Sequence, residues 1–164
     1  MDFYPWIVLA HVVLVIVAFG AHGVSAFAML SARRETDRVR LGAILDLSAT
    51  SLGVAGWGLL AAVLLGIAAA VIAGHFGRLW PWVSIVVVVG IFAAMTPMGA
   101  GPMGDVRKAL GQPARGDKAS DPPRQPASDV ELAAAQARLR PEILGAIGLV
   151  GIVVLVWLME FKPF

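Results

Sequence analysis

The chain has no cysteine, and this absence excludes several kinds of site at once. Disulfide bonds, zinc–thiolate centres, iron–sulfur clusters and thiol nucleophiles all need cysteine sulfur. Charged residues are also scarce, at 15% of the chain, compared with about 25% in ordinary soluble domains. Walker and HExxH motifs are missing as well. The sequence therefore favours a non-enzymatic protein, and its informative feature is its apolar content.

Apolar residues make up 59% of the chain, and they gather into four long runs that contain no Lys, Arg, Asp or Glu. A membrane-spanning helix needs about 20 apolar residues, with a range of about 17–25. The runs are continuous, whereas a membrane barrel requires alternation of apolar and polar residues. We therefore predict an all-α, four-transmembrane-helix bundle that forms a single membrane domain over residues 1–164. The expected helices cover residues 5–30, 48–74, 81–98 and 143–159.

The distribution of basic residues predicts the orientation of the bundle. Eleven of the thirteen Lys and Arg residues lie in the connections 31–47 and 99–142. By the positive-inside rule these connections are cytoplasmic, so both termini are outside. Five aromatic residues fall at the opposite, outer ends, as in an aromatic belt: Tyr4, Trp6, Trp80, Trp82 and Trp157. We expect a bacterial cytoplasmic (inner) membrane protein whose basic residues meet anionic lipid headgroups, with no nucleic-acid partner.

The long connection divides into parts of different composition. Residues 111–128 are rich in Pro, Gly, Ala and charged residues, so we predict a disordered cytoplasmic loop. Ser128 and Glu131 have the spacing of a capping box, which predicts a short helix from Asp129. The Gly- and Pro-rich stretch 97–102 predicts the end of the third helix.

Two histidines lie inside the first span, where ionisable residues usually face the protein interior. His11 and His22 are eleven residues apart, so they share one helix face but lie roughly 16 Å apart along the axis. That distance allows two separate sites but not one shared metal ion. The plain interpretation is that each imidazole bonds a neighbouring hydroxyl or carbonyl group. The alternatives are axial ligation of haem b, with a methionine or another chain as second ligand, and a proton or metal role.

Hydroxyl groups at the start of the second span fall at the depth of His22. We predict a polar cluster with the members His22, Ser25, Asp46 and Ser51. These residue types include those of a Ser–His–Asp triad, but no nucleophile-elbow motif accompanies them. Asp46 can equally serve as an N-terminal cap.

Small residues recur at every fourth position of the second span, which lets another helix approach closely. They are Gly58, Ala62, Gly66, Ala70 and Gly74. We expect this ladder to pack within the bundle, with oligomerisation as the alternative. Trp57, near mid-membrane, is expected to pack inside the bundle.

Three methionines follow one another at the cytoplasmic end of the third span: Met95, Met98 and Met103. Thioethers are soft ligands that suit Cu(I), so these residues form a candidate copper site. The alternative is that they are ordinary apolar residues at the end of a helix.

Four segments carry a resemblance to a known family: Leu9-Ala-His-Val-Val13, Ala21-His-Gly-Val-Ser-Ala26, residues 33–40 and Leu45-Asp-Leu-Ser48. Over about the first 110 residues the chain resembles an uncharacterised bacterial family of small predicted integral membrane proteins. A looser likeness, through His11, is to copper-resistance and haem-handling four-helix membrane proteins. The resemblance implies the same architecture and assigns no activity.

Together these features predict a non-enzymatic multi-pass membrane protein that acts as a subunit, a scaffold or a small-molecule handling module. A haem-binding redox or haem-handling protein that uses the helix-1 histidines is the alternative, and a copper transport accessory is the third. Expected partners are the lipid bilayer and either further copies of the chain or other membrane subunits.

Overall fold

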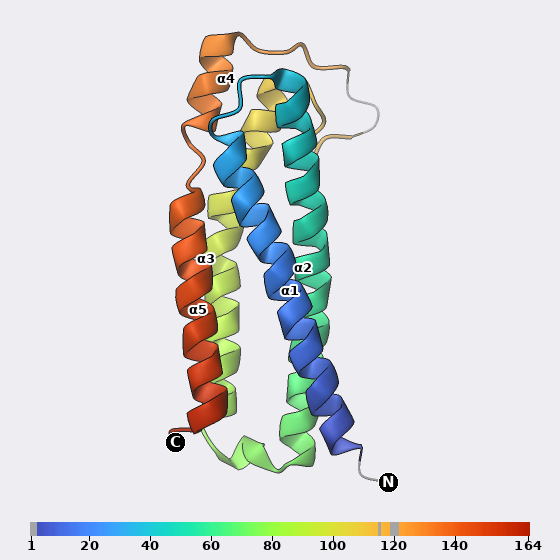
Figure 1. Ribbon diagram of the computed structural model, residues 1–164, viewed down its shortest axis with the longest axis vertical. Coiled ribbons are helices and arrows are strands. Elements are labelled where there is room, and N and C mark those ends of the chain that lie inside the picture. Colours follow the sequence, from blue (N-terminus) through green and yellow to red (C-terminus); the bar gives the residue numbers. More distant parts are fainter. Residues whose placement is uncertain (1–2, 115, 119–121) are drawn as a thin grey trace.

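The computed structural model describes residues 3–114, 116–118 and 122–164. Within them the chain forms α1 (Tyr4–Ala32), α2 (Arg38–Ile72), the short 3-10 helix η1 (His75–Gly77), α3 (Trp80–Ala109), α4 (Asp129–Gln136) and α5 (Pro141–Phe161). Four helices, α1, α2, α3 and α5, are long and apolar enough to cross a membrane, and the described residues form no strand. The predicted all-α, four-helix bundle is confirmed (Figure 1).

The second long helix begins ten residues before the expected start, because its cap is Asp37. The Asp37 carboxylate accepts hydrogen bonds from the backbone N–H groups of Val39 and Arg40, at 2.8 and 2.9 Å. The expected start at Ser48 is therefore wrong. At the other end α2 stops at Ile72, and Gly74 lies beyond it with a φ of +66°, a left-handed conformation that favours glycine.

The third helix continues through Pro97 and Pro102 to Ala109, so the predicted end at Met98 is wrong. Each proline lacks the N–H that would bond the carbonyl four residues earlier. The helix continues because its second half buries Met103, Val106 and Ala109 in the main core. Packing of this apolar face outweighs the local cost of the two prolines.

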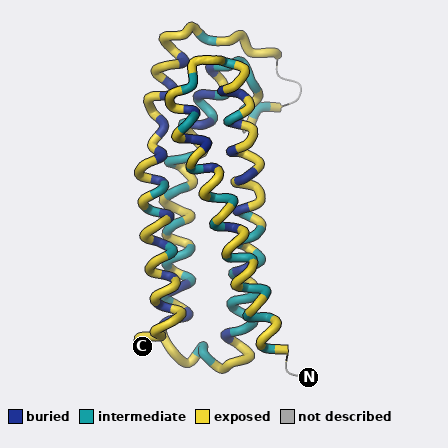
Figure 2. Tube along the Cα trace, viewed as in Figure 1, coloured by how far each residue is buried: buried dark blue, intermediate teal, exposed yellow. Residues whose placement is uncertain are grey.

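The bundle consists of two helix pairs. α1 packs along α2 and α3 packs along α5, whereas α2 and α3 make few contacts with each other. The pairs join at one end, where Leu41, Leu45, Val106 and Leu139 are fully buried in the main core. Figure 2 shows more buried residues at this end than along the rest of the bundle. The start of α1 and the end of α5 lie together at the opposite end (Figure 1).

Polar contacts hold the core end together. The side-chain amide of Gln136 donates to the carbonyl oxygens of Ala32 and Glu35, at 2.7 and 2.8 Å, and thereby ties α4 to the end of α1. Ion pairs link helices that are distant in sequence: Arg33 with Glu142, Arg38 with Asp129 and Arg107 with Asp46. These ion pairs connect the helices at the surface of the core end.

The connection between α3 and α4 contains no helix or strand in its described residues. Its last residues are held to the end of α3 by the Ala127 N–H, which donates to the Ala109 carbonyl at 2.9 Å. Within the connection the Ala114 N–H donates to the Asp117 carboxylate at 2.8 Å. The predicted disordered loop includes residues 115 and 119–121, which lie outside the described residues, and its disorder stays a prediction. The capping box of Ser128 and Glu131 is confirmed.

Candidate functional site

His11 is held by a hydrogen bond between α1 and α2. Its Nδ1 lies 2.7 Å from the backbone oxygen of Ala62, and a carbonyl only accepts, so Nδ1 carries the proton. Gly66, one turn further along α2, makes room for the ring. A β-carbon added at Gly66 would stand 2.9 Å from Cε1 and 3.1 Å from Nδ1 of His11. This imidazole is engaged in packing the first helix pair.

The small residues of α2 face α1 inside the bundle. Ala62 and Ala70 are buried, and a β-carbon added at Gly58 would stand 3.4 Å from Cβ of Ala18. Gly74 does not belong to this ladder, because it lies beyond the end of α2. Trp57 points away from the bundle and is 76% exposed, so the prediction that it packs inside is wrong. The small-residue face is the one that α2 buries, which leaves the indole on the outer face.

The predicted polar cluster forms with different members. Ser25 Oγ lies 2.7 Å from Ser48 Oγ, and Ser48 Oγ lies 3.9 Å from Sδ of Met103, so one polar chain joins α1, α2 and α3. Asp46 does not join, because its carboxylate pairs with Arg107 at 2.7 Å and is 67% exposed. Ser51 is buried on α2 but is not the partner of Ser25.

Ser48, which the sequence analysis left out of the cluster, had a signal in the sequence. Leu41, Ser48, Ala55 and Ala62 recur at seven-residue intervals and are all buried. Such a repeat marks the seam of two helices packed side by side. Extending the second helix back to Arg38 would have placed Ser48 on that seam.

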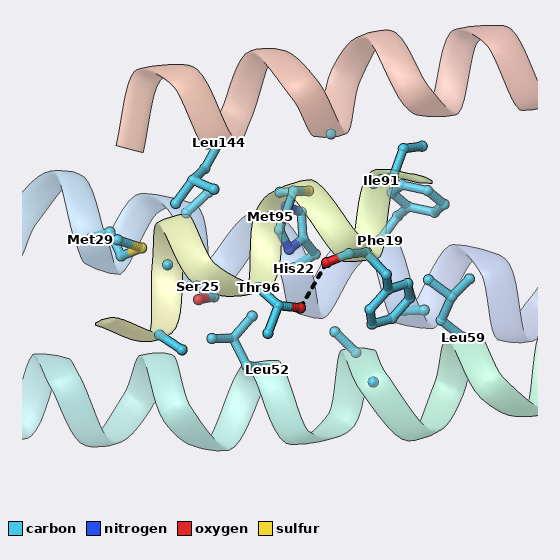
Figure 3. Close-up of a pocket in the computed structure, with 18 of the residues that line it drawn as sticks. Phe19, His22, Ser25, Met29, Leu52, Leu59, Ile91, Met95, Thr96 and Leu144 are labelled. Atoms are coloured by element: carbon cyan, nitrogen blue, oxygen red, sulfur yellow. Dashed lines mark hydrogen bonds between the residues drawn. The ribbon is translucent and has the colours of Figure 1, made fainter. Parts of the chain in front are cut away.

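A cavity of about 340 Å³ lies between the two helix pairs. Its walls come from α1, α2, α3 and α5, and they are almost entirely apolar (Figure 3). Three of the lining side chains carry polar atoms: His22, Ser25 and Thr96. Ser25 is bonded to Ser48, and Thr96 Oγ1 donates to the Phe92 carbonyl at 2.8 Å. His22 differs from both, because its Nε2 has no hydrogen-bond partner among the described residues.

His22 lies against α5 and α3, so the prediction that it packs against hydroxyls of the second span is wrong. A β-carbon added at Gly148 of α5 would stand 3.2 Å from Nε2 of His22 and 4.0 Å from Cε of Met95. Nε2 is buried and has no hydrogen-bond partner among the described residues. In Figure 3 His22 and Met95 lie beside each other. The absence of a β-carbon at Gly148 lets the backbone of α5 lie close to the imidazole, and Met95 of α3 lies near the same point.

The exposure of the walls shows on which side the cavity opens. Ser25 and Met29 of α1 and Leu144 of α5 are buried. By contrast, Leu52 of α2 is 39% exposed and Phe92 of α3 is 44% exposed. The open side therefore lies between α2 and α3, the two helices that make few contacts with each other.

Met95 and Met98 both pack against the main core, to which Met103 belongs. Met95 and Met103 also line the cavity. Met103 already accepts the Ser48 hydroxyl. Among the described residues no group of three or more His, Asp or Glu could hold a metal ion. The copper site at the three methionines stays a prediction, and Met95 is also a neighbour of His22.

The described geometry assembles no hydrolytic triad, because Ser25 is bonded to Ser48 and Asp46 to Arg107. What it offers is an apolar cavity lined by one imidazole, whose buried Nε2 has no hydrogen-bond partner among the described residues. Comparisons of the chain with protein-family models, with curated proteins and with solved structures find no match.

Proposed function

We propose that this multi-pass membrane protein binds a small, largely apolar molecule in the cavity, with His22 as the polar anchor. The observation that carries the proposal is the buried, unpaired Nε2 of His22. Leaving such a group unsatisfied costs about 1–3 kcal/mol, and buried polar groups in native proteins nearly always have a partner. A bound molecule supplies the partner that the chain itself does not.

Comparison of the two histidines supports this role. His11 has the same chemistry and the same helix, yet its Nδ1 is bonded to Ala62 and its ring fits the space at Gly66. His22 lines a cavity instead. Water is a poor occupant, because an ordered water needs two to four polar partners and apolar cavities stay dry. The cavity therefore suits an organic molecule better than a solvent molecule.

We propose that the core end, with the long connection, lies in the cytoplasm of a bacterial cell, and that both termini lie outside the cytoplasmic membrane. The basic residues of the two connections support this orientation. Single cysteines are informative here because the chain has none of its own. A membrane-impermeant maleimide added to intact spheroplasts should label Phe164→Cys, and it should label Gln125→Cys only after lysis. Labelling of both variants in intact spheroplasts would refute the orientation.

Benzophenone tests the binding function directly, since it is small, neutral and apolar, has one carbonyl oxygen and cross-links on illumination. In proteoliposomes that contain the full chain, peptide mapping should find labels on cavity residues, with Met95 foremost. Labelling resolved to the Trp57 side chain itself, which is exposed on the outer face of α2, serves as the internal reference.

Two glycines of α5 provide a matched pair of variants. Gly148→Ala places a methyl group against Nε2 of His22, whereas a β-carbon at Gly145 meets no atom within 4 Å. We expect Gly148→Ala to lower cavity labelling several-fold relative to the Trp57 reference, and Gly145→Ala to leave it unchanged. Equal labelling of cavity and outer-face peptides in the native chain would overturn the proposed function.

Haem binding is the second candidate, favoured by the position of Met95 beside His22, because His and Met together form a known pair of axial haem ligands. It ranks second because Gly148 of α5 lies against Nε2. A macrocycle would have to separate α5 from α1, whereas a smaller molecule needs only a turn of the flexible Met95 side chain. Protein purified from haem-supplied cells can be examined for a Soret band. A band that is lost in His22→Phe and kept in His11→Phe would place haem before the small apolar molecule as the ligand.

A further inference from the structure

We infer that the molecule bound at His22 is a lipid-soluble quinone, held by a carbonyl oxygen of its ring while its isoprenoid tail stays in the bilayer. The inference rests on the proposed function and narrows its ligand class. Four properties of the cavity carry it: the charge of its walls, its single free polar group, its shape and aromatic lining, and the side on which it opens.

The walls require a neutral ligand. None of the side chains that line the cavity is Lys, Arg, Asp or Glu. A carboxylate or an ammonium group would enter an apolar site without a counter-ion, which is strongly unfavourable. Fatty acids, lipid phosphates and cationic amphiphiles are therefore poor occupants, whereas a quinone ring has no charge.

The polar lining requires a ligand with one principal hydrogen-bonding atom on the side of α1. A neutral imidazole has one N–H donor and one acceptor nitrogen. With the proton on Nε2, His22 donates to a carbonyl oxygen. Ser25 and Thr96 are already bonded, to Ser48 and to the Phe92 carbonyl. A polyhydroxylated or amide-rich molecule would leave most of its polar groups unpaired here.

The size and lining of the cavity suit a flat ring system. Its volume of about 340 Å³ lies at the small end of ligand sites, which run from about 300 to 1,000 Å³. Phe19 lies one helical turn before His22 on the same face of α1, and Phe92 lines the cavity from α3. Aromatic rings favour offset or edge-to-face contacts with another ring. A one- or two-ring headgroup can thus contact an aromatic side chain while its oxygen meets the imidazole (Figure 3).

The opening between α2 and α3 accommodates the rest of such a molecule. Leu52 and Phe92, which border it, are exposed at membrane depth. A ring that enters there leaves its tail among the lipid chains, so the cavity need not enclose the whole ligand. Met95 lies beside His22 near Gly148, and its unbranched side chain can adapt to a ligand at Nε2.

Competition with benzophenone labelling tests the ligand class in proteoliposomes of the full chain. The competitors are 2-methyl-1,4-naphthoquinone and 2-methylnaphthalene, which share a carbon skeleton and differ in the two carbonyl groups, with decanoate as the charged competitor. The quinone cannot add to a thiol, because the chain has no cysteine. We expect half-maximal protection of the Met95 peptide at about a tenfold lower concentration of quinone than of methylnaphthalene, the effect of one hydrogen bond. Decanoate should protect least.

The advantage of the quinone over methylnaphthalene should disappear in His22→Phe and remain in His11→Phe. Gly148→Ala, which keeps the imidazole, should weaken quinone protection, and Gly145→Ala should not, so the test does not depend on His22→Phe folding. Two results would overturn the quinone assignment while leaving the cavity as a binding site. In the first, quinone and methylnaphthalene protect the cavity equally from benzophenone labelling; in the second, decanoate protects it best. Absence of cavity labelling would instead refute the proposed function itself.

Discussion

Gly66 and His11 form the tightest contact between a glycine and an imidazole in the first helix pair, and Gly66→Ala probes it. The new methyl carbon would stand 2.9 Å from Cε1 and 3.1 Å from Nδ1 of His11. The ring cannot simply rotate away, because Nδ1 is bonded to the Ala62 oxygen at 2.7 Å. Either the ring gives up this hydrogen bond or the two helices move apart.

The expected loss of stability follows from three contributions. Overpacking of a well-fitted contact costs about 1–3 kcal/mol, and a lost hydrogen bond costs about 1 kcal/mol more. Alanine recovers up to about 1 kcal/mol through its better helix propensity. We therefore expect Gly66→Ala to lower the free energy of unfolding by about 2 kcal/mol.

Unfolding in mixed micelles of dodecylmaltoside with increasing dodecyl sulfate, followed by circular dichroism, measures this change. Gly53→Ala is the matched control on α2, since a β-carbon there meets no atom within 4 Å. Adding His11→Ala to Gly66→Ala should recover part of the loss, because it removes the crowding. If Gly66→Ala is as stable as Gly53→Ala, the argument that His11 is a packing residue fails.

Two further predictions concern the core end. The backbone N–H groups of Arg40 and Val39 lower the pKa of the Asp37 carboxyl below its ordinary value. The ionised cap therefore stabilises α2 fully at pH values above the pKa that Asp37 has in the unfolded chain. This stabilisation is lost as the pH falls through the pKa that Asp37 has in the folded chain. At pH values below about 4 the thermal stability of the native chain should therefore decrease by more than that of Asp37→Asn, which keeps a capping oxygen but does not titrate. Equal acid sensitivity of the two proteins would contradict this prediction. Gln136→Leu removes both hydrogen bonds between α4 and the end of α1. Amide hydrogen exchange in residues 129–139 should therefore be at least tenfold faster than in Gln125→Leu, a control at an exposed position. Unchanged exchange would show that the Gln136 amide does not hold α4.

The four spans were predictable because uncharged apolar runs of this length have one stable form in a membrane. The ends of α1 and α5 were predicted to within two residues, but the start of α2 and the end of α3 were not, since each depends on a partner outside the run. α2 starts at Arg38 because Asp37 caps it, and the charged residues before Ser48 concealed that start. α3 passes two prolines because Val106 and Ala109 are buried against a distant part of the chain. Local signals cannot weigh that burial.

The candidate site was predictable in its residue and not in its surroundings. His22 was identified because an imidazole inside a span needs an explanation. Helix periodicity placed it on the same face as His11, yet one ring contacts α2 and the other contacts Gly148 of α5. Which helix meets each ring depends on the crossing of the two pairs, and nothing within α1 encodes that crossing. Gly148 is the residue that sequence reasoning missed, since a glycine in an apolar run has no signal of its own.

The pairing of the helices also predicts the order in which they assemble. α1 and α2 follow each other directly, and the bonds between them, His11 to Ala62 and Ser25 to Ser48, lie wholly within Tyr4–Ile72. We therefore expect the α1–α2 hairpin to form before α3 has been made. α3 packs mainly on α5, so its main partner is complete only after the long connection has been translated. On this order Gly148 reaches His22 in the last step of assembly.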